Sequence, residues 1–449
     1  MLSSLNQEAL SKAKRLGAEQ SEAFSARTRT VSVYVDDSKV KSVEEKLDQG
    51  ITLRVMMGKR RGQVSSSVSS EEDVARVAER AIKATRLSNP DPDLKGFVQP
   101  KEAAIGAPRV WDARIAELEG SDLVAFAKGI VEAAREVGEV KIPRGLIRAA
   151  TIETAVSNSN GVEVGHSSTM YYLHYTSMVT SPRPGEGIEA AYGTQLDIDV
   201  EGIGRKLYEG ARNSALAKPF KGKRNFVAII PPGELAEMLL TTVGAASGEN
   251  VNFRRSRWVE SLGKEVASKE VTIRDDPTDP RGVLCSRFDD EGTPSRRKTI
   301  VEGGVLKELY YDSYSAGIAG AESTGNGLKR SSIDAQGIYQ HSVGCSVMNL
   351  VLAPGTLSPG ELISDVDEGV IIERFAWPDV DQLTGRFGLE VRCGHLVKGG
   401  EITETINHAL LMGNMYDALK NVRGIGNDSK VVGRAIVPTV SFEGIELVG

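Results

Sequence analysis

The chemistry that this sequence could perform starts with a cysteine and a histidine two residues apart, Cys393 and His395 in the segment RCGHL. The segment has the pattern of a β-strand, and side chains two apart on a strand point to the same face. A thiolate beside an imidazole could bind a soft or borderline metal ion, or could belong to a hydrolase site. The competing interpretation is structural, because most free cysteines in strands are small residues of the core.

Three further groups of potential ligands occur along the chain. His166 and His174 share a face of a predicted strand, but at about 3.3 Å per residue they lie roughly 26 Å apart, too far to share a metal ion. His341 and Cys345 form another pair, for which packing in the core is again the competing interpretation. The acidic run at residues 289–291 could supply carboxylate ligands, yet it precedes a glycine, and this composition predicts a turn that opens the next strand.

The elements that must position these residues belong to a large folded chain. Its 449 residues are too many for one compact core, so two or three domains are expected. Hydrophobic residues make up 40% and charged residues 26%, as in ordinary soluble proteins, and 47 glycines indicate many turns and much β structure. A net charge of -6 disfavours a nucleic-acid-binding protein, because neutralising phosphates needs a concentrated basic surface. We therefore expect no nucleic acid among its partners.

Three blocks of predicted elements divide the chain at residues 1–98, 110–217 and 223–449. A capping box of Ser69 and Glu72 marks the start of one helix in the first block. The other elements predicted in the first two blocks are helices over 5–16, 121–136 and 200–215, strands over 30–35, 50–55 and 63–68, and two strands joined by an Asn-Gly turn at 158–161. The third block is rich in strands. This order predicts an α+β fold, in which a small mixed α/β N-terminal half is followed by a β-rich C-terminal domain.

The N-terminal segment MLSSLNQEALSKAKRLG lacks the charged and apolar regions of a signal peptide, and no later window approaches 18 uncharged apolar residues. The three cysteines are an odd number spread over a long chain, which fits a reducing compartment better than a disulfide framework. We therefore expect a cytoplasmic protein with no membrane partner.

One segment of the third block, IIPPGELAEMLLTTVGAASGEN at residues 229–250, has the frame of a metalloprotease helix. A strand ends in a Pro-Pro-Gly turn, and the helix that follows has an apolar face with Leu235, Met238 and Leu239. Where such a helix would carry zinc ligands, this one has none.

The order of several segments resembles the TldD/PmbA family, whose members were once described as modulators of DNA gyrase. The segments that carry the resemblance are PPGELAEMLL, IRDDPTDPRG, SRFDDEGTPSRR, VEGGVLKELYYDSYSA, STGNG, FGLEVRCGHLVKGGEI and LLMGNMYDALKNVRGIG. The resemblance covers nearly the whole chain and is strongest from residue 225 onward. It implies a cytoplasmic zinc metalloprotease system that degrades or trims unfolded peptides, in which a TldD subunit bears the zinc and a TldE (PmbA) subunit does not.

In the zinc-bearing subunit, the resemblance implies an HExxxH motif on the helix after the Pro-Gly turn and a cysteine ligand near the C-terminus. Two imidazoles and a thiolate hold the ion, and the glutamate deprotonates the bound water. In this sequence the corresponding positions are Leu240, Thr241, Ala245 and Gly426, none of which can bind zinc or move a proton in that role. The chain is therefore similar to the TldE type, with no cofactor or metal of its own and with zinc expected in a TldD-type partner.

Two functions from different classes follow. The favoured one is a non-catalytic subunit that pairs with a TldD-like paralogue as a heterodimer, or with itself as a homodimer, and completes a chamber for unfolded peptides. The alternative is an independent homodimeric hydrolase that uses another site, for example around Cys393 and His395. A regulator of DNA topology is disfavoured, because the chain is acidic and has no recognition helix or basic stripe.

Overall fold

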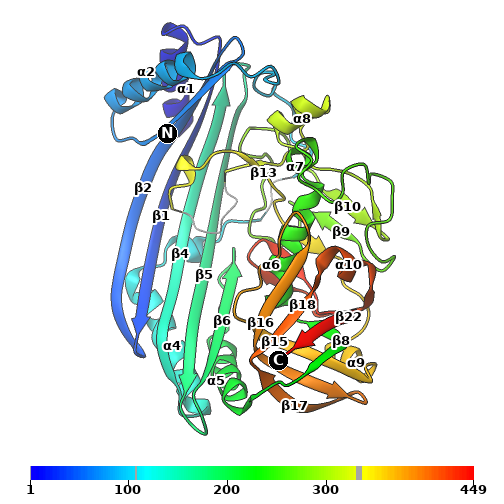
Figure 1. Cartoon of the computed structure of the whole chain (residues 1–449). Helices are drawn as coiled ribbons and strands as arrows, with labels where there is room; N and C mark the ends of the chain where they lie inside the picture. The colour runs from blue at the N-terminus through cyan, green and yellow to red at the C-terminus, as the bar shows by residue number, and fades with distance from the viewer. Residues whose placement is uncertain (1, 107–108, 330–335) are drawn as a thin grey trace.

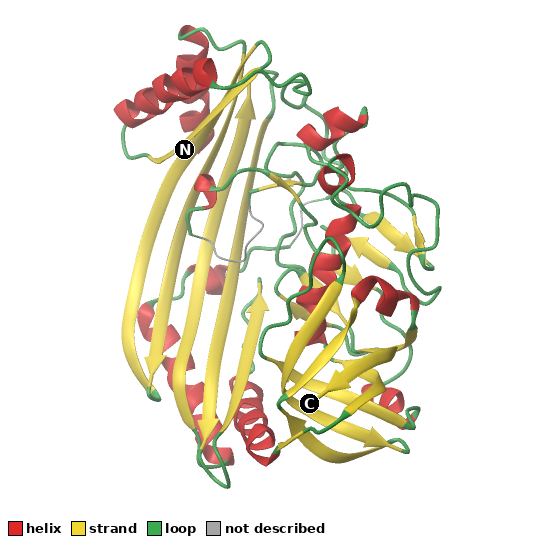
Figure 2. Cartoon of the chain, viewed as in Figure 1, coloured by secondary structure: helices red, strands yellow, loops and turns green. Residues whose placement is uncertain are grey.

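The computed structural model describes residues 2–106, 109–329 and 336–449. It has the predicted α+β fold, with two parts that lie side by side (Figure 1 and Figure 2). The N-terminal half forms a long curved sheet with helices, and the C-terminal part is β-rich and contains the C-terminus.

The long sheet has six antiparallel strands in the order β3-β2-β1-β4-β5-β6. Their bounds are β1 (Gln20–Asp36), β2 (Lys39–Met57), β3 (Arg60–Ser67), β4 (Lys141–Asn158), β5 (Glu163–Val179) and β6 (Gly185–Gly193). The predicted strands are present but longer, because residues on either side of the predicted ranges also pair with neighbouring strands. Since β1 pairs with both β2 and β4, strands from residues 1–98 and 110–217 form one sheet. The division of the N-terminal half into two domains stays a prediction.

Helices cover one face of the long sheet near both of its ends. The odd-numbered residues of β1 point to this face, because side chains alternate along a strand. Ala23 packs against one helix pair, and Val31 and Val33 pack against the other. The first pair is α1 (Leu2–Arg15) and α2 (Glu71–Leu87), and the second is α4 (Gly120–Val137) and α5 (Val200–Leu216), with the short α3 (Ala113–Ala116) nearby. No helix within the described ranges is long and apolar enough to cross a membrane.

The start of α2 differs by one residue from the prediction. The capping box is formed by Ser70 and Asp73 rather than by Ser69 and Glu72. The Asp73 carboxylate accepts hydrogen bonds from the backbone N–H groups of both serines at 2.9 Å. Two serines followed by three acidic residues allow two registers, and the shorter aspartate side chain closes the box.

The two larger sheets of the C-terminal part share one core with helix α6 (Pro232–Val243), and β12 and β13 pair separately. The larger sheet has the order β15-β8-β22-β18-β16-β17-β7, with β19 paired to β22, and the smaller has the order β11-β10-β9-β14-β21-β20. The strand bounds are β7 (Lys218–Pro219), β8 (Lys223–Ile230), β9 (Ile273–Asp275), β10 (Lys298–Glu302), β11 (Val305–Leu306), β14 (Leu350–Leu352), β15 (Glu368–Phe375), β16 (Arg386–Lys398), β17 (Glu401–Asn407), β18 (Ala409–Asn414), β19 (Val422–Ile425), β20 (Lys430–Val432), β21 (Ala435–Val437) and β22 (Val440–Val448). The smaller elements are η1 (Gly244–Ala246), α7 (Gly248–Asn252), α8 (Ser313–Ala319), β12 (Gly327–Leu328), η2 (Ile338–Gln340), β13 (Gly344–Cys345), α9 (Pro359–Ser364) and α10 (Met415–Lys420).

A buried set of charges joins the two parts. Arg54 on β2 donates hydrogen bonds to Glu22 on β1 and, at 2.9 Å, to Glu291 of the C-terminal part. The Arg54 side chain is 7% exposed and both carboxylates are 1% exposed. The turn predicted at residues 289–291 is present, because the Asp289 carboxylate accepts hydrogen bonds from the backbone N–H groups two and four residues later. Its burial against the long sheet was not predicted.

Another contact between the two parts is apolar. Ile338 and Tyr339 of η2 pack against Phe24 and Ile152 on the face of the long sheet opposite the helices. A Cβ atom added to Gly50 of β2 would lie 2.3 Å from the Tyr339 ring, so this close approach requires glycine.

Candidate functional site

Helix α6 has the predicted position and apolar face. It follows β8 and starts with Pro231 as N-cap and Pro232 as first residue. Proline is tolerated there, because the N–H group of a first helical residue has no partner within the helix. Leu235, Met238 and Leu239 have no exposed surface and pack in the core that both C-terminal sheets share. The frame of the helix is therefore that of a buried core element.

Three of the four positions that the resemblance assigns to the zinc site lie at the C-terminal end of α6 and in the turn that follows it. Leu240 and Thr241 are partly buried, and Ala245 is fully buried in the 3₁₀ turn η1 that follows. Residues 238–246 carry only Met, Leu, Thr, Val, Gly and Ala side chains. Zinc needs imidazole, thiolate or carboxylate ligands, so this segment does not fit the ion.

Gly426, the fourth assigned position, faces away from the α6 core. A Cβ atom added there would lie 2.5 Å from Asp428 Oδ1 and 3.5 Å from Leu362 of α9. The preceding residue, Ile425, belongs to the same apolar core as α6. Because successive strand residues point to opposite faces, the geometry favours position 425 over 426 for a side chain directed at that core.

Restoring the ligands tests whether the backbone around α6 keeps the geometry of a zinc site. We expect the variant Leu240→His, Thr241→Glu, Ala245→His with Ile425→Cys to bind zinc at least about 10-fold more tightly than the same triple variant with Gly426→Cys. The reason is the direction of the two side chains, since only position 425 faces the core that contains α6.

Both variants would carry Cys393→Ser, so that zinc binding at the group of Glu373, Cys393 and His395 does not contribute to the measured affinity. Zinc affinity is obtained by competition with a chromophoric chelator, and circular dichroism checks that each variant is folded. Equal affinities, or no gain over the Cys393→Ser parent, would contradict the orientation inferred for positions 425 and 426.

Glu234 in the first turn of α6 is a partly buried acidic group next to β15. Its carboxylate accepts a hydrogen bond from the Phe375 N–H group at 2.9 Å. Burial raises the pKa of Glu234 from 4.5 to about 7, against the smaller opposing effects of this hydrogen bond and of Arg374. The protonated form is therefore favoured in the folded chain up to near neutral pH.

This pKa predicts that Glu234 makes the chain less stable as pH rises. Between pH 4.5 and about 7 the folded carboxyl keeps a proton that the unfolded one releases, so the free energy of unfolding falls through this window. Glu234→Gln should therefore be more stable than the parent at pH 8 by about 1–3 kcal/mol, and equal to it near pH 4. Urea unfolding at both pH values measures this. Glu237→Gln, a substitution of an exposed glutamate on the same helix, is the control. If the stability difference between Glu234→Gln and the parent is the same at pH 4 and pH 8, the prediction is refuted.

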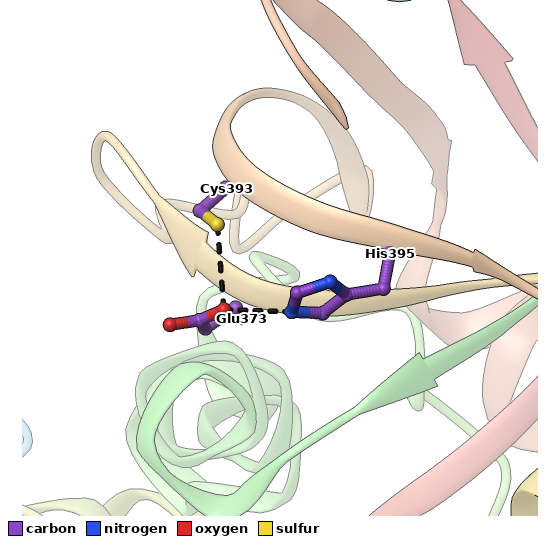
Figure 3. A group of neighbouring side chains, drawn as sticks. All are labelled: Glu373, Cys393 and His395. Atoms are coloured by element: carbon purple, nitrogen blue, oxygen red, sulfur yellow. Dashed lines mark hydrogen bonds and ion pairs between the residues drawn. The ribbon is translucent and has the colours of Figure 1, made fainter. Parts of the chain in front are cut away.

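A second candidate site lies where β15 meets β16. Within the described residues, one group of three His, Cys, Asp or Glu side chains brings its ligand atoms within 4.8 Å of one another, namely Glu373, Cys393 and His395 (Figure 3). Cys393 Sγ donates to Glu373 Oε2 at 3.3 Å, and His395 Nε2 lies 2.7 Å from the same oxygen. The predicted cysteine and histidine therefore converge, and they do so on a carboxylate that the sequence did not indicate.

A β-bulge brings Glu373 into this group. Ile372 pairs with Gly394 and Arg374 pairs with Cys393, which leaves Glu373 as an extra residue between two paired ones. A bulge redirects a side chain out of the regular alternation of a strand. Sequence patterns missed Glu373 because it is 20 residues from Cys393 and its direction depends on this bulge.

The arrangement does not suit a cysteine nucleophile. Cys393 is 1% exposed, and the His395 Nε2 atom contacts Glu373 Oε2, where a catalytic base would contact the sulfur. Burial, followed by the charge of Glu373, raises the pKa of the Cys393 thiol. A reactive cysteine needs a lowered pKa, so the site gives no support to a hydrolase in which Cys393 is the nucleophile.

The other predicted pairs do not form ligand groups. His166 and His174 lie on β5 opposite two different residues of β4, as their spacing requires. Neither they nor His341 and Cys345 belong to a group of three ligands in the part of the chain that the structure describes.

Comparison with known proteins decides the family. Three family models match in succession, described as PmbA/TldA metallopeptidase domain 1 at residues 21–85, central domain at 113–215 and C-terminal domain at 223–449. The last model alone spans half of the chain. The chain belongs to the PmbA/TldD family. It is thus a member of a metallopeptidase family, and the resemblance drawn from its segments is confirmed.

Relatives within the PmbA/TldD family match over nearly the full length. Metalloprotease PmbA of Escherichia coli O157:H7 is 25% identical, over 98% of this chain and 96% of the relative. A metalloprotease of Methanothermobacter thermautotrophicus is 29% identical, over 90% of this chain and 87% of the relative. The crystal structure of TldE from Thermococcus kodakarensis superimposes with a TM-score of 0.89 over 99% of both chains, at 22% identity, which shows a shared fold.

Proposed function

We propose that this chain is a non-catalytic subunit of the TldE/PmbA type, which pairs with a zinc-bearing TldD-like paralogue in a peptidase that degrades or trims unfolded peptides. The observation that carries the proposal is segment 238–246, which keeps the frame of the helix and has no side chain fit for zinc. The full-length match to PmbA and the TldE fold support the same assignment. Helix α6 then has a structural role, and the chemistry belongs to the partner.

A heterodimer explains these features better than a homodimer. Two copies of this chain would give two α6 segments without a ligand for the catalytic ion, whereas a paralogue with HExxxH supplies the ion, the base and the bound water together. The substrate class and a cytoplasmic location follow from the family resemblance and are part of the same proposal.

The test is purification of the tagged full-length chain from its native cells, with identification of what copurifies. We expect a paralogue that carries HExxxH, and hydrolysis of a disordered protein such as casein that a chelator abolishes. The chain produced alone should be inactive, and adding the purified paralogue should restore activity. Activity is the deciding measurement, because zinc content alone does not locate the ion. Chelator-sensitive hydrolysis of casein by the chain alone would overturn the proposal.

A further inference from the structure

We propose that Glu373, Cys393 and His395 together bind one divalent transition-metal ion of the zinc class. This site lies in the larger C-terminal sheet, apart from the α6 positions of the family ligands, and does not depend on the proposed function. The proposal departs from the expectation that this chain binds no metal. That expectation rested on the α6 positions and on a cysteine–histidine pair for which no third ligand was known.

The three ligand atoms already have nearly the spacing that an ion requires. Ligands around a tetrahedral zinc ion, with bonds of about 2.0 to 2.3 Å, are roughly 3.3 to 3.6 Å apart. Cys393 Sγ and Glu373 Oε2 are 3.3 Å apart, His395 Nε2 and Glu373 Oε2 are 2.7 Å apart, and the remaining separation is at most 4.8 Å. Shifts of about an ångström in the side chains would therefore bring all three atoms into contact with one ion.

Outer hydrogen bonds hold the ligands in this direction. His395 Nδ1 contacts Thr405 Oγ1 at 3.1 Å, which leaves Nε2 directed at the other two ligands. Asn213 of α5 donates to Glu373 Oε1 and Oε2, at 3.4 and 3.1 Å. Metal-binding histidines and carboxylates in proteins are commonly held by such second contacts. The group is thus supported from β17 on one side and from the N-terminal half on the other.

The ligand types select the class of ion. A thiolate with an imidazole favours zinc or another borderline ion, and disfavours magnesium and calcium, which take oxygen ligands. Three protein ligands leave a fourth position for water. His395 and Glu373 have side chains that are 16% and 27% exposed, which gives an ion a path from solvent to the buried Cys393 sulfur.

The location also predicts an effect of the ion on the contact between the two parts. Glu373 lies on the C-terminal sheet and Asn213 on α5, so an ion that fixes the carboxylate also fixes the acceptor of this hydrogen bond. An ion that binds the folded chain alone raises its melting temperature. We therefore expect zinc to stabilise the full-length chain against heat.

The experiment is a titration of the full-length chain with Co²⁺, followed by competition with Zn²⁺. We expect one equivalent of Co²⁺, visible bands of tetrahedral intensity and a thiolate-to-cobalt charge-transfer band, all lost when Zn²⁺ is added. A double variant, Cys285→Ser with Cys345→Ser, keeps Cys393 as its remaining cysteine and should give the same spectrum. Cys393→Ser should lose the charge-transfer band and bind at least about 100-fold more weakly, and Thr405→Val should bind about 10-fold more weakly.

Three results would overturn the site. They are an unchanged charge-transfer band in Cys393→Ser, its loss in the Cys285→Ser, Cys345→Ser double variant, and less than one equivalent of Co²⁺ in the parent chain. The parent titration decides by itself if Cys393→Ser fails to fold. A zinc-dependent rise in melting temperature in the parent, absent from a folded His395→Ala variant, is the second readout.

Discussion

Arg54→Leu is expected to lower the free energy of unfolding by about 3–5 kcal/mol, because it leaves buried carboxylates without their partner. Arg54 is 7% exposed and donates hydrogen bonds to Glu22 and Glu291, which are each 1% exposed. Glu22 belongs to the long sheet and Glu291 to the C-terminal part, so the two carboxylates lie on opposite sides of the junction. Ser313 also donates two hydrogen bonds to Glu291, at 2.8 and 2.6 Å, but it carries no charge to balance the carboxylate. Urea unfolding followed by circular dichroism measures the change.

Arg423 offers a matched control, because it also contacts two carboxylates. Its side chain is 34% exposed, and those of its partners Asp365 and Glu443 are 66% and 56% exposed. Exposed ion pairs contribute little, so Arg423→Leu should cost no more than about 1 kcal/mol. Similar losses for the two substitutions would show that the Arg54 cluster gains nothing from its burial at the junction.

Leu239→Ala is expected to cost about 2–5 kcal/mol, as for other leucines whose removal leaves a cavity in a packed core. Leu239 has no exposed surface and lies among residues of α6 and both C-terminal sheets, including Trp258. Trp258 is 4% exposed, whereas the other two tryptophans are 45% and 75% exposed, so urea unfolding followed by tryptophan fluorescence reports on this core.

Leu240→Ala is the control for the same helix. Leu240 is only partly buried, so its truncation removes less buried surface and should cost about 1 kcal/mol. This contrast tests the structural role of α6, in which residue 239 packs in the core and residue 240 occupies a position that the family resemblance assigns to a zinc ligand. If Leu240→Ala lowers the free energy of unfolding more than Leu239→Ala does, then α6 presents a different face to the core.

Several elements could be predicted from the sequence because their signals are local. The helix now seen as α4 follows from its apolar periodicity, and the β4–β5 hairpin follows from an Asn-Gly turn. The Pro-Pro-Gly entry of α6 and its apolar face are local too, and so is the lack of zinc ligands in residues 238–246. The order of short segments along the chain was enough to indicate the family that the comparisons show.

The position of α2's cap shows the limit of such signals. Ser69 and Ser70 are followed by three acidic residues, so the sequence allows two capping boxes, and the structure forms the one with Asp73. The local pattern does not choose between the two boxes, because it contains a suitable serine and acidic residue for each.

Tertiary structure alone decided which distant residues meet. The sequence by itself determined that Cys393 and His395 share a face, but a bulge on another strand adds Glu373 to them. The sequence also determined a turn at residues 289–291. In the structure this turn is buried against the long sheet, where the pairing of β1 with β2 places Arg54 beside Glu291. The physical reason is the same in both cases: a strand's alternation fixes which side chains share a face, whereas register, bulges and docking between sheets fix what that face contacts.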